Sequence, residues 1–188
     1  MAEGVRDPQT SSPGSAAEET VPDGVRFKRV NTLVDERGSL CEMFDERWDW
    51  PSDPLVYSYF CTIRPGVVKG WALHREHEDR YLVVQGEMEV TLYDDREDSP
   101  TRGLLSQIYL TEFDRRLMNI PAGVWHADRN VGAKDVLLVN FPTRAFDHEN
   151  PDKYRLPLDT ELIPHSFGDA RGWGAWSSRP PTSRAPRF

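Results

Sequence analysis

Short segments in which hydrophobic and polar residues alternate recur through the middle of the chain. The clearest lies at residues 87–93, where Met88, Val90 and Leu92 alternate with acidic or hydroxyl side chains. Successive side chains of a β-strand point to opposite faces, so these three residues are expected to share a buried face. Strands are predicted on this basis at residues 25–30, 40–44, 55–63, 67–73, 81–84, 88–93, 105–110, 117–120 and 136–141.

Turn signals separate these predicted strands. Pro65-Gly66 is a favourable turn pair, and Gln85-Gly86 interrupts two apolar segments. Before Pro142, no stretch of about twelve residues has a convincing helical period. Many short strands with regular turns favour a sandwich or barrel, so the chain is predicted to be all-β.

The two ends of the chain differ in composition from this middle part. Residues 1–22 are rich in Ser, Ala, Glu, Pro and Gly and are predicted to form a disordered leader. Residues 168–188 are predicted to form a flexible tail, although Trp173 and Trp176 could dock on the domain or on a partner subunit. A single domain is therefore expected over residues 23–167.

Composition excludes several classes of protein. The 188 residues carry a formal net charge of −8, which argues against a nucleic-acid binder with a basic face. Cys41 and Cys61 are too few for a disulfide framework. The N-terminus lacks the apolar core of a secretory signal, and no apolar run approaches the roughly 18 residues of a membrane span. We therefore expect a cytoplasmic protein without a membrane-spanning segment.

Two motifs make the all-β prediction more specific. The first has His74 and Asp79 between spaced glycines, and the second is a Pro-x-Gly turn followed by His126. They resemble the first and second cupin motifs. This resemblance implies a cupin-type jelly-roll, the double-stranded β-helix barrel. Ala72 stands where the first motif usually has a histidine, and Asp79 where it usually has a glutamate.

The spacing of the first motif suggests a common centre. Residues two apart on a strand point to the same side, so positions 72 and 74 are expected to face the barrel interior. Asp79 from the next strand and His126 from the opposite sheet are expected to converge there. Two imidazoles and one carboxylate suit Fe(II) or Mn(II), and Zn is a further option. A metal site at His74, Asp79 and His126 is therefore one hypothesis.

A longer series of segments narrows the family. Four of them occur in a typical order, at residues 35–44, 69–71, 93–103 and 120–126. Over roughly residues 25–150 the chain resembles the dTDP-4-dehydrorhamnose 3,5-epimerase family. The resemblance implies a homodimer that acts in deoxysugar biosynthesis, binds a nucleotide sugar in the barrel mouth and needs no cofactor.

The resemblance also implies substrate contacts. Arg37 and Glu42 would help to hold the nucleotide, and Lys69 stands where the family has an arginine that contacts the phosphates. Arg96 is a further candidate, although an arginine can equally tie strand ends together through ion pairs.

The family's catalytic residues do not carry over. Epimerisation removes a proton beside a keto group, and it needs a base, a cation near the enolate and a proton donor on the opposite face. In an alignment with the family, the histidine base corresponds to Ala72 and the lysine near the enolate corresponds to Asp79. The tyrosine proton donor aligns near Asn140. His74 or His126 is therefore expected to act as the base, with Asp79 as an orienting or catalytic carboxylate. Asn140 is expected to contact the substrate.

Neighbouring residues have simpler explanations. Glu76 and His77 lie in a charged turn and are expected to be solvated. Trp71 and Trp125 are expected to pack in the jelly-roll core. Asp152 would cap a local turn.

Three functions remain open. The first is a sugar-nucleotide epimerase or isomerase that acts on a 4-keto deoxysugar nucleotide with a non-standard site. The second is a metal-dependent cupin, a dioxygenase or isomerase, that uses the His74, Asp79 and His126 set. The third is a non-catalytic sugar-binding cupin, which Ala72 suggests.

Overall fold

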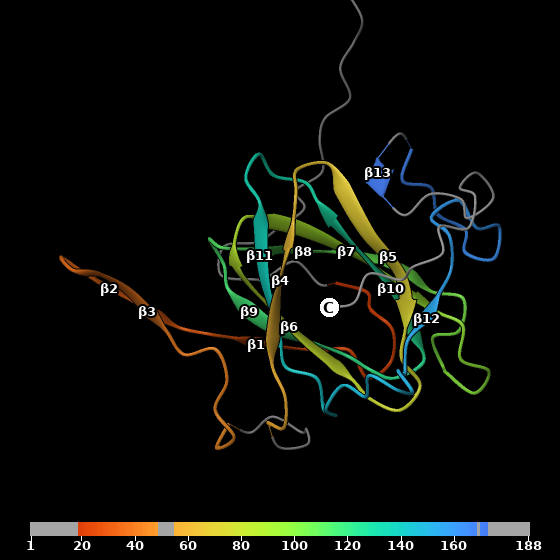
Figure 1. Ribbon diagram of the computed structural model, residues 1–188, viewed down its shortest axis with the longest axis horizontal. Coiled ribbons are helices and arrows are strands. Elements are labelled where there is room, and N and C mark those ends of the chain that lie inside the picture. Colours follow the sequence, from red (N-terminus) through yellow and green to blue (C-terminus); the bar gives the residue numbers. More distant parts are fainter. Residues whose placement is uncertain (1–18, 49–54, 169, 173–188) are drawn as a thin grey trace, which may run out of the picture.

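Two β-sheets face each other and form the body of the protein (Figure 1). The computed structural model describes residues 19–48, 55–168 and 170–172. One sheet has the order β1-β9-β6-β11-β4, and the other has the order β12-β5-β10-β7-β8 with β13 also beside β5. The strands are β1 Arg26–Arg29, β2 Thr32–Asp35, β3 Gly38–Cys41, β4 Tyr59–Ile63, β5 Val67–Leu73, β6 Asp79–Gln85, β7 Glu87–Asp94, β8 Leu105–Thr111, β9 Arg116–Ile120, β10 Val124–Asn130, β11 Val136–Asn140, β12 Tyr154–Arg155 and β13 Arg171–Gly172.

The architecture confirms the all-β prediction. The described residues form strands, turns and loops without a helix. In this part of the chain, accordingly, no helix is long and apolar enough to cross a membrane. Every strand pair is antiparallel except β13 with β5.

The main core lies between the two sheets. Met88, Val90 and Leu92 of β7 are fully buried, as their alternation predicted. They pack with residues from both sheets, among them Ile108 of β8 and Met118 of β9. Burial of one such side chain contributes about 1.5–3 kcal/mol, so this alternation stabilises the packing of the two sheets.

A second cluster covers the outer side of β5. Trp71 is fully buried there and packs with Ile163 and Phe167 from the C-terminal segment, which confirms that it is a packing residue. The residue before Trp71 must be glycine for a steric reason. A Cβ atom at this position would lie 2.4 Å from the Cβ of Ala127 in the neighbouring strand β10. Only glycine allows this close approach of β5 and β10.

Four strands were not predicted from the sequence: β2, β10 and the two-residue strands β12 and β13. β2 was not assigned, and the residues of β10 were read only as a turn motif. In β10 the inward positions include His126, Asp128 and Asn130, all buried. Because polar residues occupy the inward side, the usual apolar alternation is absent.

Residues 19 and 20, where the described part of the chain begins, contact the barrel. The Arg116 guanidinium pairs with Glu19 at 2.6 Å, and Ser106 Oγ donates a hydrogen bond to the Thr20 carbonyl at 2.7 Å. Residues 19–22, the last part of the predicted leader, thus lie on the domain. Trp173 and Trp176 lie outside the described residues.

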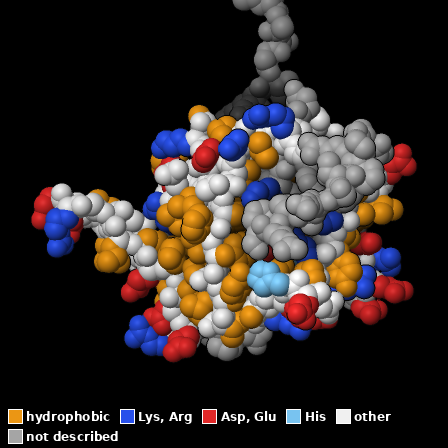
Figure 2. All heavy atoms as spheres, viewed as in Figure 1, with side chains coloured by type: hydrophobic (Ala, Val, Ile, Leu, Met, Phe, Trp, Pro, Cys, Tyr) orange, Lys and Arg blue, Asp and Glu red, His pale blue; other side chains and the backbone are white. Residues whose placement is uncertain are grey.

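The antiparallel pair β2–β3 forms a ribbon that projects away from the barrel (Figure 1). Its apolar residues are exposed: Leu33 by 68%, Val34 by 77% and Leu40 by 60%. Figure 2 shows hydrophobic side chains gathered beside the base of this ribbon and over β4, where Phe60 is 69% exposed.

Candidate active site

A buried carboxylate lies between two histidines. Asp79 is only 2% exposed, and its Oδ2 atom is 3.3 Å from His74 Nε2 and 3.5 Å from His126 Nε2. Its other oxygen, Oδ1, accepts a hydrogen bond from Asn140 Nδ2 at 2.7 Å. The structure therefore brings together four of the residues that the sequence singled out.

The distribution of these residues over the two sheets differs from the one predicted from the sequence. The prediction that His126 comes from the sheet opposite to His74 is wrong, because β10 is the direct neighbour of β5 and His126 pairs with Ala72. Asp79 is the residue from the opposite sheet, at the first position of β6. Since residues that pair across a ladder share a face, Ala72 does face the same side as His126, as expected.

The two sequence motifs are joined by a backbone hydrogen bond. His74 follows the last residue of β5, and its carbonyl accepts a hydrogen bond from Gly123 N–H at 2.7 Å. Gly123 has a φ of +81°, which favours glycine at this turn. The Pro-x-Gly turn of the second motif therefore holds the histidine of the first.

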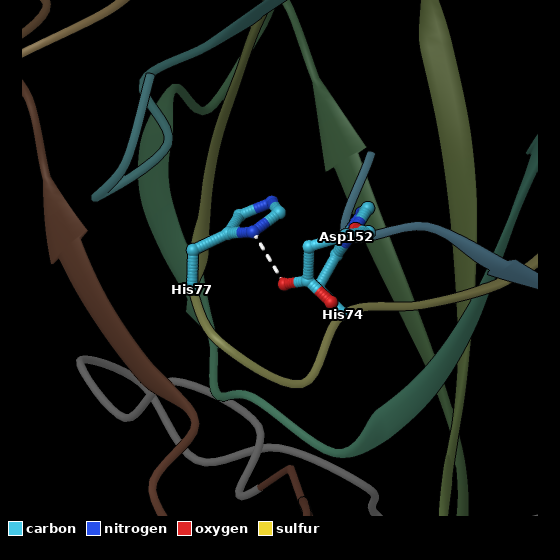
Figure 3. A group of neighbouring side chains, drawn as sticks. All are labelled: His74, His77 and Asp152. Atoms are coloured by element: carbon cyan, nitrogen blue, oxygen red, sulfur yellow. Dashed lines mark hydrogen bonds and ion pairs between the residues drawn. The ribbon is translucent and has the colours of Figure 1, made fainter. Parts of the chain in front are cut away.

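His77 and Asp152 belong to the same cluster, which the sequence analysis missed. Asp152 Oδ2 accepts a hydrogen bond from His77 Nδ1 at 2.8 Å (Figure 3). The Asp152 backbone carbonyl accepts one from His74 Nδ1 at 2.5 Å. His77 Nε2 lies 3.9 Å from Asp79 Oδ1. The expectation of a solvated His77 is wrong, because a loop 75 residues further along the chain covers it.

Asp152 fixes the orientation of both rings. Besides the bond to His77, its carboxylate accepts hydrogen bonds from the backbone N–H groups of Arg75 and Glu76, at 2.9 and 2.8 Å. With both Nδ1 atoms engaged as donors, the Nε2 atoms of His74 and His77 are directed to Asp79.

The electrostatic environment shifts the pKa values of His74 and His126 in opposite directions. Burial opposes the charged form of His74, but the Asp79 carboxylate, 3.3 Å from the His74 Nε2 atom, outweighs burial and raises the pKa of His74. Burial lowers the pKa of His126 to about 4, although Asp79 acts in the opposite direction. The pKa of Asp79 itself is lowered, because the nearby imidazoles of His74 and His126 and the hydrogen bond from Asn140 outweigh burial. At neutral pH, His126 is therefore neutral.

A second carboxyl group faces the same interior. Asp128, two residues after His126 on β10, is 6% exposed and its Oδ2 is 3.4 Å from the hydroxyl of Tyr81. Its Oδ1 is buried without a hydrogen-bond partner among the described residues. Burial and the charge of Asp79 raise the pKa of Asp128 to about 7. Its position in the second motif, on the same side as His126, was the available signal for this residue.

A tyrosine lies on the other side of Asn140. Asn140 Nδ2, which donates to Asp79, is also 3.0 Å from the hydroxyl of Tyr59, the first residue of β4. Sequence reasoning did not single out Tyr59, because its proximity to position 140 depends on the pairing of β4 with β11.

The predicted nucleotide-binding residues are distributed differently. Lys69 is on β5 directly across from Asp128, and thus close to the histidine–aspartate cluster. Arg37 lies at the tip of the projecting ribbon, where it pairs with Asp35 and its side chain is 82% exposed. Glu42 follows the ribbon and lines a surface cavity of about 340 Å³ together with Leu55.

Arg96 belongs to a local hydrogen-bonding network. Its Nε and Nη2 atoms donate to the two oxygens of Asp94 at 2.9 and 2.8 Å. Asp94 is fully buried and also accepts hydrogen bonds from Ser99 and Thr101, at 2.6 and 2.7 Å. The Asp-Asp-Arg and Ser-Pro-Thr segments thus fold onto one carboxylate. Arg96 and Trp125 also line an outer cavity of about 430 Å³.

The cluster contains donors suited to a metal ion. Ligand atoms of His74, Asp79 and His126 all lie within 4.8 Å of one another, and so do those of His74, His77 and Asp152. The buried Asp79 Oδ2 has no hydrogen bond within the described part of the chain. Two imidazoles and a carboxylate fit Fe(II) or Mn(II), and Zn accepts the same donors.

Comparisons with known proteins place these residues in a family. The model of the polysaccharide biosynthesis C-terminal domain matches residues 33–154. The probable low-salt glycan biosynthesis epimerase Agl13 of Haloferax volcanii is 40% identical over 137 residues, which cover 72% of this chain and 86% of that protein.

Solved structures share the fold. A dTDP sugar isomerase from Desulfovibrio desulfuricans G20 superposes with a TM-score of 0.73 at 28% identity, over 79% of this chain and 95% of that one. The dTDP-6-deoxy-D-glucose-3,5-epimerase of Legionella pneumophila, solved with dTDP-4-keto-L-rhamnose, gives a TM-score of 0.64 at 22% identity, over 74% and 76% of the two chains. The predicted cupin jelly-roll of the 3,5-epimerase type is thereby confirmed.

Proposed function

Since the chain belongs to the polysaccharide biosynthesis C-terminal domain family and has the cupin fold of the 3,5-epimerases, we propose that it is a sugar-nucleotide epimerase. Its substrate would be a 4-keto deoxysugar joined to a nucleoside diphosphate, dTDP in the first instance. The observation that carries this proposal is the buried Asp79 carboxylate between His74 and His126, at 3.3 and 3.5 Å.

The two histidines take different roles in this proposal. His126 is neutral at pH 7 because its pKa is about 4, so its Nε2 can accept a proton from the carbon beside the keto group. The pKa of His74 is raised beside Asp79, which favours its charged form, and a charged imidazole there would stabilise negative charge that develops on the keto oxygen. Two titratable groups whose environments push their pKa values apart suit an acid–base site.

Substrate binding uses the remaining polar groups. Lys69 is exposed, lies across from Asp128 and offers a cation for the diphosphate. Asn140 donates a hydrogen bond to Asp79 at 2.7 Å and would hold this carboxylate in place beside the bound sugar.

The test is proton exchange. The protein is incubated with dTDP-4-keto-6-deoxyglucose in D₂O, and NMR follows both loss of the C–H signals beside the keto group and formation of the epimer. We expect exchange and epimer formation, both reduced at least about 100-fold in His126→Gln. His148→Gln is the matched control, because His148 lies in an exposed loop. Binding of the nucleotide sugar without any exchange would refute catalysis and support the sugar-binding alternative.

The oligomer in this proposal is a homodimer. The β2–β3 ribbon carries exposed Leu33, Val34 and Leu40 away from its own barrel, and Arg37 is at its tip. A ribbon of this kind can reach a second copy, where Arg37 and Glu42 would approach the partner's nucleotide. The exposed apolar area around β4 is a matching surface for it (Figure 2).

A metal-dependent function is the second candidate, favoured by the convergence of His74, Asp79 and His126. A bound Fe(II), Mn(II) or Zn(II) would polarise a keto oxygen as a Lewis acid. Purification without chelator followed by elemental mass spectrometry tests this candidate. About one metal ion per chain that is lost in Asp79→Asn would support it, whereas a metal-free protein with full exchange activity would exclude it.

A further inference from the structure

Inversion at a carbon atom needs proton delivery on the face opposite to proton removal. His126 is part of the sheet that contains β5 and β10, and His74 directly follows β5. A proton donor is therefore to be sought on the facing sheet, which contains β6, β11 and β4.

Tyr59 has the position for this task on the facing sheet. It is the Cα partner of Asn140 in the β4–β11 ladder, so both side chains lie on the same face. Asn140 Nδ2 donates to the Tyr59 hydroxyl oxygen at 3.0 Å and to Asp79 Oδ1 at 2.7 Å. The side-chain amide of Asn140 thus connects the Tyr59 hydroxyl to the histidine–aspartate cluster.

The hydroxyl proton of Tyr59 is available. The Tyr59 oxygen accepts a hydrogen bond from Asn140, and among the described residues it donates to none. Tyr59 is 41% exposed, so a substrate can reach it. Burial on the inner side and the charge of Asp79 raise the pKa of Tyr59, and the hydroxyl therefore keeps its proton at neutral pH.

The other interior tyrosine is less suited to this role. Tyr81 is 4% exposed, and its hydroxyl donates to Asp128 Oδ2 at 3.4 Å. The proton of Tyr81 therefore already has an acceptor, whereas that of Tyr59 has none among the described residues.

We propose that Tyr59 is a catalytic residue, the proton donor that completes inversion on the face opposite to His126; this inference rests on the proposed epimerase function. His126 Nε2 takes the proton from the carbon beside the keto group, and the electron pair of that C–H bond forms the enolate. The O–H bond of Tyr59 then breaks, its proton forms the new C–H bond on the opposite face, and the electron pair stays on the tyrosine oxygen. The Asn140 amide stabilises this tyrosinate. Exchange with solvent afterwards removes the proton from His126 and returns one to Tyr59.

The experiment separates proton removal from proton delivery. Tyr59→Phe is incubated with dTDP-4-keto-6-deoxyglucose in D₂O, and NMR measures deuterium incorporation with retained configuration and formation of the inverted sugar. We expect inversion to fall at least about 100-fold while deuterium incorporation with retention persists, because His126 can still remove and return a proton on its own face. Tyr57→Phe is the matched control, since Tyr57 packs against Tyr59 with ring centroids 5.8 Å apart.

The outcomes are distinct. Inversion by Tyr59→Phe at the wild-type rate would overturn the assignment of Tyr59 and leave the epimerase function intact. Loss of both exchange and inversion in Tyr59→Phe would also overturn it, since a donor is not needed for proton removal. Absence of exchange in the wild-type protein would instead refute the proposed function itself.

A second variant keeps the side chain in place. Site-specific 3-fluorotyrosine at position 59 has a more acidic hydroxyl than tyrosine, so the alkaline limb of the inversion rate should move to lower pH. An unchanged pH profile of the inversion rate would overturn the proposal.

Discussion

Asn140 donates a hydrogen bond from Nδ2 to Asp79 Oδ1 at 2.7 Å, and the two residues lie on neighbouring strands, β11 and β6. Asn140 is fully buried, and its Oδ1 accepts a hydrogen bond from the Arg80 backbone N–H at 2.9 Å. This amide is therefore anchored on one side and orients the carboxylate on the other.

Removal of this amide should destabilise the fold. We expect Asn140→Ala to lower the free energy of unfolding by about 2 kcal/mol, because the buried Asp79 carboxylate loses a charge-assisted hydrogen bond. Urea denaturation at pH 7 measures the change. Asn150→Ala, in an exposed loop, is the control and should stay within about 0.5 kcal/mol of the wild type. An equally small change in Asn140→Ala would contradict the role given to the amide.

Neutralisation of Asp79 should change the titration of its neighbour. Because Asp79 raises the pKa of His74, Asp79→Asn should lower the pKa of His74. NMR titration of the imidazole signals measures this shift. Asp98→Asn removes an exposed carboxylate and should leave His74 unchanged. A His74 pKa that stays raised in Asp79→Asn would mean that Asp152 is its main stabilising partner.

The part of the site that could be predicted from sequence follows local geometry. The offsets between positions 72, 74 and 79 are set by strand parity and a short turn, and the Pro-x-Gly turn marks His126. These short-range features identified the residues that meet at Asp79. The wrong sheet assigned to His126 concerned strand order, which no local pattern specifies.

The missed residues depend on long-range pairing. Asp152 meets His77 across 75 residues, through a loop without periodic pattern. Tyr59 meets Asn140 only through the register of β4 with β11, and a shift of one residue would turn its side chain to the other face. Strand register of this kind could not be read from a single sequence.

The projecting ribbon should determine the oligomeric state. Val34 is 77% exposed on the ribbon, and a dimer would bury it against the partner. We expect Val34→Glu to weaken dimerisation by about 2 kcal/mol or more, roughly 30-fold, because it places a charge in an apolar contact. Size-exclusion chromatography with light scattering over a dilution series measures this. Phe113→Ser is the control, since Phe113 is 79% exposed in the loop after β8. A monomeric wild-type protein would refute the proposed dimer.

The buried carboxyl group of Asp128 should make stability depend on pH. Its ordinary pKa of 3.8 is raised to about 7 by burial and by the charge of Asp79, so between these pH values the folded protein holds a proton that the unfolded chain has released. The stabilisation by this proton is complete below about pH 4 and is lost as the pH rises through 7.

Asp128→Asn removes this loss, since an amide does not ionise. Relative to the wild type, we therefore expect the variant to gain about 4 kcal/mol in unfolding free energy between pH 4 and pH 8, about 1.4 kcal/mol for each of the three pKa units. His126 acts with the opposite sign, because its pKa is lowered from 6.5 to about 4 and its contribution is lost as the pH falls through that window. This effect is present in both proteins and cancels in the difference between them. Urea denaturation at several pH values gives that difference, with Asp98→Asn as the exposed control. A difference that is constant with pH, or that favours the wild type at pH 8, would show that Asp128 is ionised in the folded protein and held by a cation such as Lys69.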